Sequence, residues 1–165
     1  MKRFLQGLAL LSGALIIQIL ASHRVPWMQR SVDLVLLVVV YYGSIGARVG
    51  ATVAGAAGGL LEDVWFGNLM GLHGLTKTLI GYLLGGLGVR FDLTSPAFRI
   101  VAVLLATLIE RLVEPAVRLG IGVHASPPDL LELFWRSAGN VLVGSLFFLS
   151  LAGKRMGRRR RLAAA

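Results

Sequence analysis

The chain has 165 residues, of which 56% are hydrophobic, and it carries a formal net charge of +9 with a mean hydropathy of +0.76. Water-soluble domains carry a smaller apolar share, so the composition excludes an ordinary soluble globular protein. The sequence has no cysteine, which excludes disulfides, thiolate metal sites and thiol nucleophiles. Its basic residues flank apolar runs instead of alternating with aromatic residues, which argues against nucleic-acid binding.

Six apolar segments predict an all-α polytopic membrane protein. A helix needs roughly 20 mostly apolar residues to cross a hydrocarbon core about 30 Å thick. A transmembrane β-barrel would show alternating polarity instead, and a helix satisfies its own backbone hydrogen bonds in lipid. The expected transmembrane helices cover residues 4–21, 32–45, 47–66, 72–89, 97–119 and 130–152, and a polybasic cytoplasmic tail covers 154–165. Because segment 32–45 is short, five spans stay open as an alternative.

The distribution of basic residues predicts the orientation. Six spans place both termini on one side, and most of the 17 lysines and arginines fall on that side. By the positive-inside rule, both termini are expected to be cytoplasmic, in a bacterial inner membrane.

Segment 47–66 carries rows of small residues at four-residue spacing. Residues four apart share one helix face, so such rows form a groove that admits another helix closely. The residues expected to serve helix packing in this segment are Gly46, Gly50, Ala54 and Gly58 in one row, and Gly55 and Gly59 in the other. Segment 72–89 repeats the pattern with Gly81 and Gly85, for which packing within the chain and homodimerisation both stay open.

Two adjacent carboxylates, Glu62 and Asp63, follow these rows. An ionised carboxylate at the centre of a membrane helix costs about 2.5 to 3.5 kcal/mol on insertion scales, so it needs a partner or a wet cavity. A turn at Gly67 would bring Lys77 to a similar depth as Asp63, so Lys77 is the expected counter-ion and His73 a second donor. Three interpretations follow: carboxylates in interfacial water, a polar lock that fixes the hairpin and shapes a periplasmic-facing recess, or a proton relay.

Charged residues also end segment 97–119. They are Glu110, Arg111, Glu114 and Arg118, of which the last two are spaced for an (i, i+4) ion pair. The group is interpreted either as the solvated end of the helix or as a charged contact with a partner protein.

The tail contains six basic residues next to the last span. Each such charge near an anionic leaflet contributes about 1 kcal/mol. Contact with anionic lipids is therefore expected, with binding of a cytoplasmic partner as the alternative. The residues are Lys154, Arg155, Arg158, Arg159, Arg160 and Arg161.

The sequence contains no recognised catalytic motif. HExxH, the phosphate-binding loop GxxxxGK[ST], GxSxG and a Cys/His cluster are all missing. We therefore expect no enzyme, no cofactor and no metal site.

The stretch from residue 58 to residue 91 resembles the rod-shape-determining protein MreD family. It has a G-x-x-x-D helix end at Gly59 and Asp63, a turn at Gly67, a second glycine at Gly71, and a glycine-rich helix that ends in Arg90. The chain length, the six segments and the basic ends are similar as well.

This resemblance implies a non-enzymatic component of the cell-wall elongation complex. Its implied partners are the MreC protein, the MreB filament, and the peptidoglycan polymerase with its penicillin-binding transpeptidase. It also implies a fold related to the substrate-binding subunits of energy-coupling-factor transporters. The first functional hypothesis is a membrane scaffold that maintains cell shape by binding partner helices through its glycine-lined faces. The alternative is a small-molecule-binding subunit of a vitamin-type transporter, with its site at Glu62, Asp63, His73 and Lys77.

Overall fold

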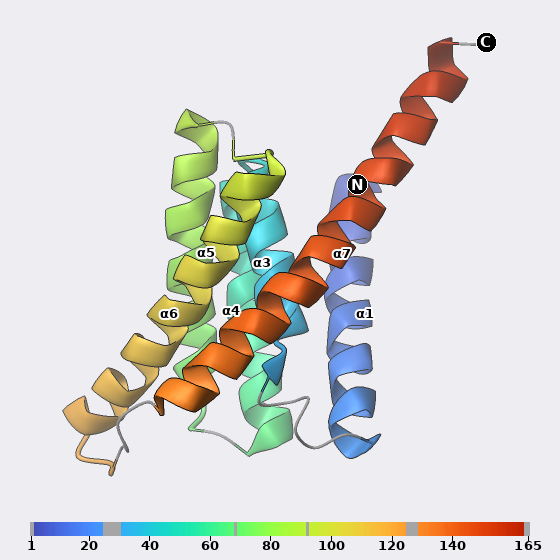
Figure 1. Ribbon diagram of the computed structural model, residues 1–165. Helices are drawn as coiled ribbons and strands as arrows, with labels where there is room; N and C mark the ends of the chain where they lie inside the picture. The colour runs from blue at the N-terminus through green and yellow to red at the C-terminus, as the bar shows by residue number, and fades with distance from the viewer. Residues whose placement is uncertain (1, 25–30, 68, 92, 125–128, 164–165) are drawn as a thin grey trace.

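The computed structural model describes residues 2–24, 31–67, 69–91, 93–124 and 129–163, without the side chains of residues 2–6, 8 and 151–163. Over this part of the chain every regular element is a helix, which confirms the all-α prediction (Figure 1). The helices are α1 (Lys2–Arg24), α3 (Leu34–Ser44), α4 (Arg48–Phe66), α5 (Leu72–Arg90), α6 (Pro96–Gly120) and α7 (Leu130–Ala163). Helix α7 continues past residue 152, so it includes most of the segment expected to be a separate tail.

Helix α3 lies at the centre of the bundle and packs against all five of the other described helices. Every residue from Val35 to Tyr41 is buried, which explains why this segment is apolar on all its faces. With 11 residues, α3 is only about 16 Å long at a rise of about 1.5 Å per residue. Segment 32–45 is therefore too short to cross a hydrocarbon core of about 30 Å by itself.

Helices α4 and α5 form the tightest hairpin of the bundle. Helix α4 ends at Phe66 and is capped by Gly67, whose φ of 65° is left-handed, a conformation that glycine adopts without steric cost. Further down the hairpin, a Cβ added to Gly55 would lie 2.3 Å from the carbonyl oxygen of Lys77, and one added to Gly81 would lie 2.4 Å from that of Ala51. Glycine at these positions allows the two backbones to touch.

The glycine-lined face of α4 is therefore occupied by the chain itself. A Cβ on Gly59 would meet the backbone of His73 in α5 at 2.5 Å, and one on Gly58 would meet Val35 in α3 at 2.5 Å. The expectation that these faces receive partner helices is wrong for Gly55, Gly58 and Gly59, because α3 and α5 already fill them.

Other members of the expected packing set have different surroundings. Gly46 lies in the turn before α4 with a φ of 71°, so it is not part of a helical row. Gly50 is exposed, whereas Ala54 is buried. Gly85 packs against Arg48, whose Cα would lie 2.5 Å from an added Cβ.

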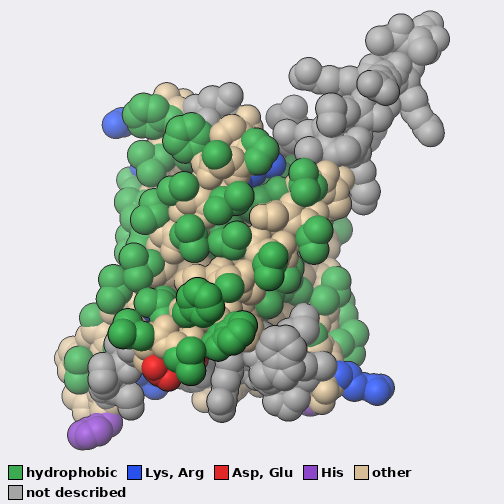
Figure 2. Space-filling model, in the orientation of Figure 1, with side chains coloured by type: hydrophobic (Ala, Val, Ile, Leu, Met, Phe, Trp, Pro, Cys, Tyr) green, Lys and Arg blue, Asp and Glu red, His purple; other side chains and the backbone are tan. Residues whose placement is uncertain are grey.

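The outer surface of the bundle is strongly apolar. Figure 2 shows hydrophobic side chains spread over one whole face of the helices. Leu142 and Leu146 of α7 are 67% and 69% exposed, and Val64 of α4 is 63% exposed. By length and hydropathy, one described stretch, Leu130–Ser150, could cross a membrane, and Ala9–Arg24 and Leu34–Ser44 are shorter apolar helices.

Candidate functional site

A cluster of charged side chains lies buried inside the bundle. The ammonium group of Lys77 on α5 is completely buried, and it contacts three carboxylates. Its Nζ lies 2.7 Å from Oδ2 of Asp33, 2.5 Å from Oε2 of Glu62 and 2.9 Å from Oε1 of Glu110. Asp33 immediately precedes α3, Glu62 belongs to α4 and Glu110 belongs to α6, so one cation joins four parts of the chain.

Residues from α7 and α1 complete the cluster. The guanidinium of Arg136 on α7 lies 3.4 Å from Asp33 and 3.2 Å from Glu110. The amide of Gln18 on α1 donates a hydrogen bond to Glu62 at 2.6 Å, and its oxygen accepts one from the backbone N–H of Leu34 at 2.8 Å. Five of the described helices and the N-cap residue of α3 thus contribute to what we call the charge cluster. Its residues are Gln18, Asp33, Glu62, Lys77, Glu110 and Arg136.

Hydrogen bonds connect the charge cluster to the N-terminus of α3. The carboxylate of Asp33 accepts a hydrogen bond from the backbone N–H of Leu36 at 2.8 Å, as a helix N-cap does. The side-chain oxygen of Asn140 accepts one from the backbone N–H of Asp33 at 2.7 Å, and its amide nitrogen donates to Thr107 at 3.0 Å. These bonds fix the central helix relative to α6 and α7.

A polar recess of about 330 Å³ adjoins the charge cluster. Most of its charged side chains are paired with one another. Arg111 pairs with Glu132, and Glu114 pairs with Arg118 at 3.2 Å. The lining residues are Gln18, Asp33, Glu62, Phe66, His73, Lys77, Arg111, Glu114, Glu132 and Arg136.

The expected partner of Asp63 is corrected by the structure. Its carboxylate contacts Nδ1 of His73 at 2.7 Å and accepts hydrogen bonds from the backbone N–H groups of Gly71 at 2.9 Å and His73 at 3.1 Å. Adjacent helical residues point about 100° apart, so Glu62 faces Lys77 and the bundle interior while Asp63 faces the turn. Lys77 is therefore the counter-ion of Glu62, not of Asp63. Asp63 instead stabilises the α4–α5 turn through its contacts with Gly71 and His73.

The expectation for Glu110 is also corrected. The sequence predicts that Glu110 belongs with Arg111, Glu114 and Arg118 to a solvated helix end or a partner contact, but Glu110 is 1% exposed and belongs to the charge cluster. A partner protein cannot reach it without opening the bundle. Arg111, Glu114 and Arg118 remain partly exposed, and the first two line the recess.

Sequence reasoning missed four polar residues that the fold brings together here: Gln18, Asp33, Arg136 and Asn140. Each is a polar residue within or beside an otherwise apolar segment, and such residues usually face a bundle interior.

The pairing of charges in the charge cluster indicates what it can do. Because every charge in the cluster contacts an opposite charge, the arrangement suits a structural role. Among the described residues, no group of His, Asp and Glu side chains is placed to hold a metal ion. The basic side chains of the tail, Lys154 to Arg161, lie outside the described residues.

A helical bundle with a largely apolar exterior and a buried charge cluster is the class of fold that the described residues adopt. A sequence model of the rod shape-determining protein MreD family matches residues 1–149, and the chain belongs to this family. The resemblance seen in residues 58–91 is thereby confirmed over nearly the whole chain. No match was found among curated proteins or among solved structures. The family is a membrane-protein family of the MreBCD system, which determines rod shape.

Proposed function

We propose that this protein is a non-enzymatic scaffold of the bacterial cell-wall elongation complex, embedded in the inner membrane with both termini cytoplasmic. The observation that carries the proposal is the family match over residues 1–149. The protein would maintain rod shape by holding the MreC protein and the wall-synthesis polymerase and transpeptidase together, with the MreB filament on the cytoplasmic side.

The distribution of polar and apolar side chains supports the membrane placement. Leu142 and Val64 face outward, whereas Lys77, Glu62 and Glu110 face the interior. A soluble protein has the opposite arrangement, because it rarely buries lysine or exposes large apolar areas. Helices α4 and α5 have modest hydropathy because they contain packing glycines and charges directed inward, away from the proposed lipid.

The charge cluster gives such a scaffold its rigidity. Counted along the helices at about 1.5 Å per residue, Glu62 lies about 21 Å from Arg48 and Lys77 about 20 Å from Arg90. With these arginines at the cytoplasmic surface, the cluster would lie within the outer half of the hydrocarbon core. Ion pairs are difficult to separate at that depth, so the six helices would keep fixed positions and present constant outer faces.

A shallow groove on α3, between α1 and α7, is the surface that we propose for the transmembrane helix of the MreC protein. It measures about 200 Å³ and includes Ala9, Gly13, Val38 and Phe147. Helix α1 packs against α3 and α4, whereas no Cα atom of α1 lies within 8 Å of a Cα atom of α7 in the described residues. A Cβ added to Gly13 would meet nothing within 4 Å, so a partner helix could approach closely along Ala9 and Gly13.

Co-purification with the MreC protein tests this proposal. The full-length tagged protein, extracted from membranes in mild detergent, should retain the MreC protein. Gly13→Leu should reduce that recovery by filling the groove. Gly120→Leu is the matched control, because a Cβ on this helical glycine also meets nothing within 4 Å. Equal recovery with the two variants would reject the groove, and no recovery with the native chain would reject the scaffold.

The alternative, a small-molecule subunit of a vitamin-type transporter, finds no support in the comparisons. The recess charges that it would use are largely paired within the chain. The relation to energy-coupling-factor subunits stays a prediction.

A further inference from the structure

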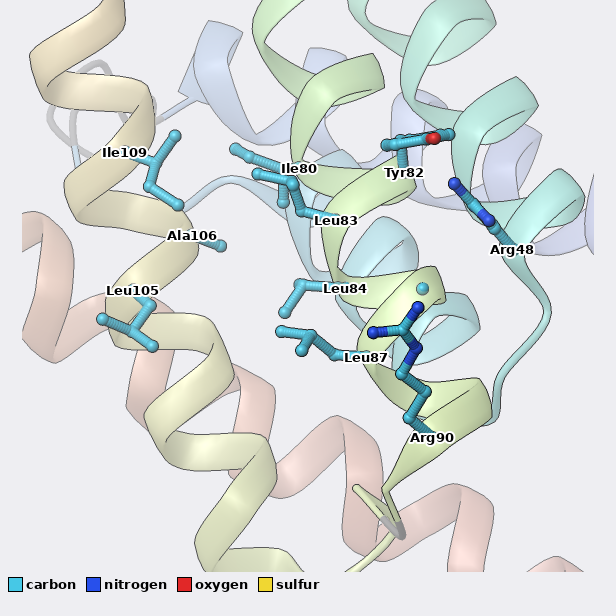
Figure 3. A pocket seen from close by; sticks show the side chains of 11 residues that line it. Arg48, Ile80, Tyr82, Leu83, Leu84, Leu87, Arg90, Leu105, Ala106 and Ile109 are labelled. Carbon is cyan, nitrogen blue, oxygen red and sulfur yellow. The ribbon is translucent and has the colours of Figure 1, made fainter.

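A second groove lies on the outer surface between α5 and α6, and the proposed scaffold role does not use it. It measures about 360 Å³, which falls in the range of small-molecule sites. Its floor is formed by the buried side chains of Ile80, Leu84 and Ala106, while Leu87 and Leu105 along its sides are 46% and 50% exposed. Figure 3 shows leucine side chains of α5 extending toward α6 across this space.

Two arginines line the same groove. Arg48 begins α4 and Arg90 ends α5; in Figure 3 both guanidinium groups lie nearer to α4 than the leucines do. The guanidinium of Arg48 lies 3.9 Å over the ring centre of Tyr82, so its direction is fixed. Neither arginine forms an ion pair with another described residue, and no carboxylate is among the groove's described lining residues.

This combination specifies the chemistry of an occupant. Guanidinium groups bind phosphate oxygens through paired hydrogen bonds, and the adjoining surface is suited to a hydrocarbon chain. The segment from Ile80 to Arg90 extends about 15 Å along α5. By the positive-inside rule, Arg48 and Arg90 lie at the cytoplasmic surface, where anionic lipids are found.

We infer that this groove binds one anionic phospholipid of the cytoplasmic leaflet. Its phosphate contacts Arg48 and Arg90, and an acyl chain lies along Leu84, Leu87 and Leu105. The inference rests on the proposed membrane placement but not on the scaffold role. It differs from contact with the basic tail, which would attract anionic headgroups without providing an apolar groove.

Native mass spectrometry of the full-length protein in detergent tests the headgroup site. Phosphatidylglycerol and phosphatidylcholine with identical acyl chains are added in equal amounts. The native chain should retain phosphatidylglycerol at least about fivefold better, since one basic contact contributes about 1 kcal/mol. Arg48→Gln combined with Arg90→Gln should lower the preference at least about fivefold, and any preference that remains belongs to the basic tail. Arg24→Gln, which makes the same type of charge change at the exposed end of α1, should preserve it.

Two tryptophan variants test the acyl-chain groove. Leu105→Trp should fill the groove and lower phosphatidylglycerol retention at least about fivefold, by displacing contacts with a buried chain. Leu108→Trp is the matched control, because Leu108 is 40% exposed on the same helix and does not line the groove.

The headgroup test also has a milder variant. If the double arginine variant does not fold, Arg90→Gln alone should lower the preference for phosphatidylglycerol, because Arg90 is exposed and the change leaves the core intact.

Several results would overturn the inference. They are equal retention of the two lipids by the native chain, an arginine variant that behaves like Arg24→Gln, and equal effects of Leu105→Trp and Leu108→Trp. Loss of the MreC protein on Leu105→Trp would also overturn it, because a partner helix would then occupy the groove. These results leave the scaffold test at Gly13 unaffected, since Gly13 belongs to the other groove.

Discussion

Replacing Lys77 with methionine removes the cation that joins three carboxylates. Methionine keeps most of the length of the lysine side chain, so the substitution chiefly removes charge. In the native chain the described cluster holds Asp33, Glu62 and Glu110 against Lys77 and Arg136. After the change, Arg136 still contacts Asp33 and Glu110, but Glu62 keeps only its hydrogen bond from Gln18.

The expected loss is about 3 to 5 kcal/mol of unfolding free energy, as for other buried ion pairs from which one partner is removed. Because the uncompensated charge falls on Glu62, adding Glu62→Gln to Lys77→Met should recover part of the loss. Glu62→Gln alone should cost less than Lys77→Met, since Lys77 would still contact two carboxylates. The double variant should therefore be more stable than the sum of the single losses implies, by roughly 1 to 3 kcal/mol.

Denaturant-induced unfolding in detergent micelles, followed by circular dichroism, measures these losses. Asp63→Asn provides the matched control, because Asp63 shares no partner with Lys77 among the described residues. Its loss should add to that of Lys77→Met within about 0.5 kcal/mol. Additive losses for Lys77→Met and Glu62→Gln would refute the direct contact between the two side chains. Recovery of the Lys77→Met loss by Asp63→Asn, and not by Glu62→Gln, would refute it as well.

Three further substitutions probe the packing around the charge cluster, each measured by the same unfolding experiment. Gly55→Ala should lower stability by about 1 to 3 kcal/mol, since its Cβ would lie 2.3 Å from a backbone oxygen of α5. The control Gly120→Ala should change stability by less than about 0.5 kcal/mol. Equal effects of the two variants would contradict the close α4–α5 contact. Gly67→Ala should cost about 1 to 2 kcal/mol because alanine at a φ of 65° is strained, and an unchanged stability would mean that the turn adopts another conformation. Arg111→Gln should cost less than about 1 kcal/mol, because its pair with Glu132 is partly exposed; a loss comparable with that of Lys77→Met would show that this pair belongs to the buried core.

The positions of the helices could be predicted because they depend on local sequence. The ends of α4, α5 and α6 fall within one residue of the expected ranges, since glycine turns and a serine-proline helix start mark them. The hairpin of α4 and α5 followed from the short turn at Gly67. The extension of α7 could not be predicted from hydropathy, because its last part is basic but still helical.

The composition of the charge cluster depends on how distant helices pack. The sequence predicted that Lys77 lies near Glu62 and Asp63, because all three belong to one hairpin, but not that it contacts Glu62 while Asp63 contacts His73. Asp33 and Arg136 are separated by 103 positions, and no local pattern indicates that they meet. The glycines of α4 face α3 and α5 because α3 lies at the centre of the bundle. A surface for a partner helix must therefore lie elsewhere on the protein.

Depletion of the protein in its own host tests the scaffold account most directly. Cell width and the sites of new peptidoglycan insertion would be followed by fluorescence microscopy while the native chain is withdrawn and either the native or the Gly13→Leu chain is supplied. The account predicts that depleted cells become round and that the insertion sites scatter. It also predicts rescue by the native chain and failure of the variant, even when the variant reaches the membrane in equal amount. Rod-shaped cells with normal wall insertion after depletion would contradict it.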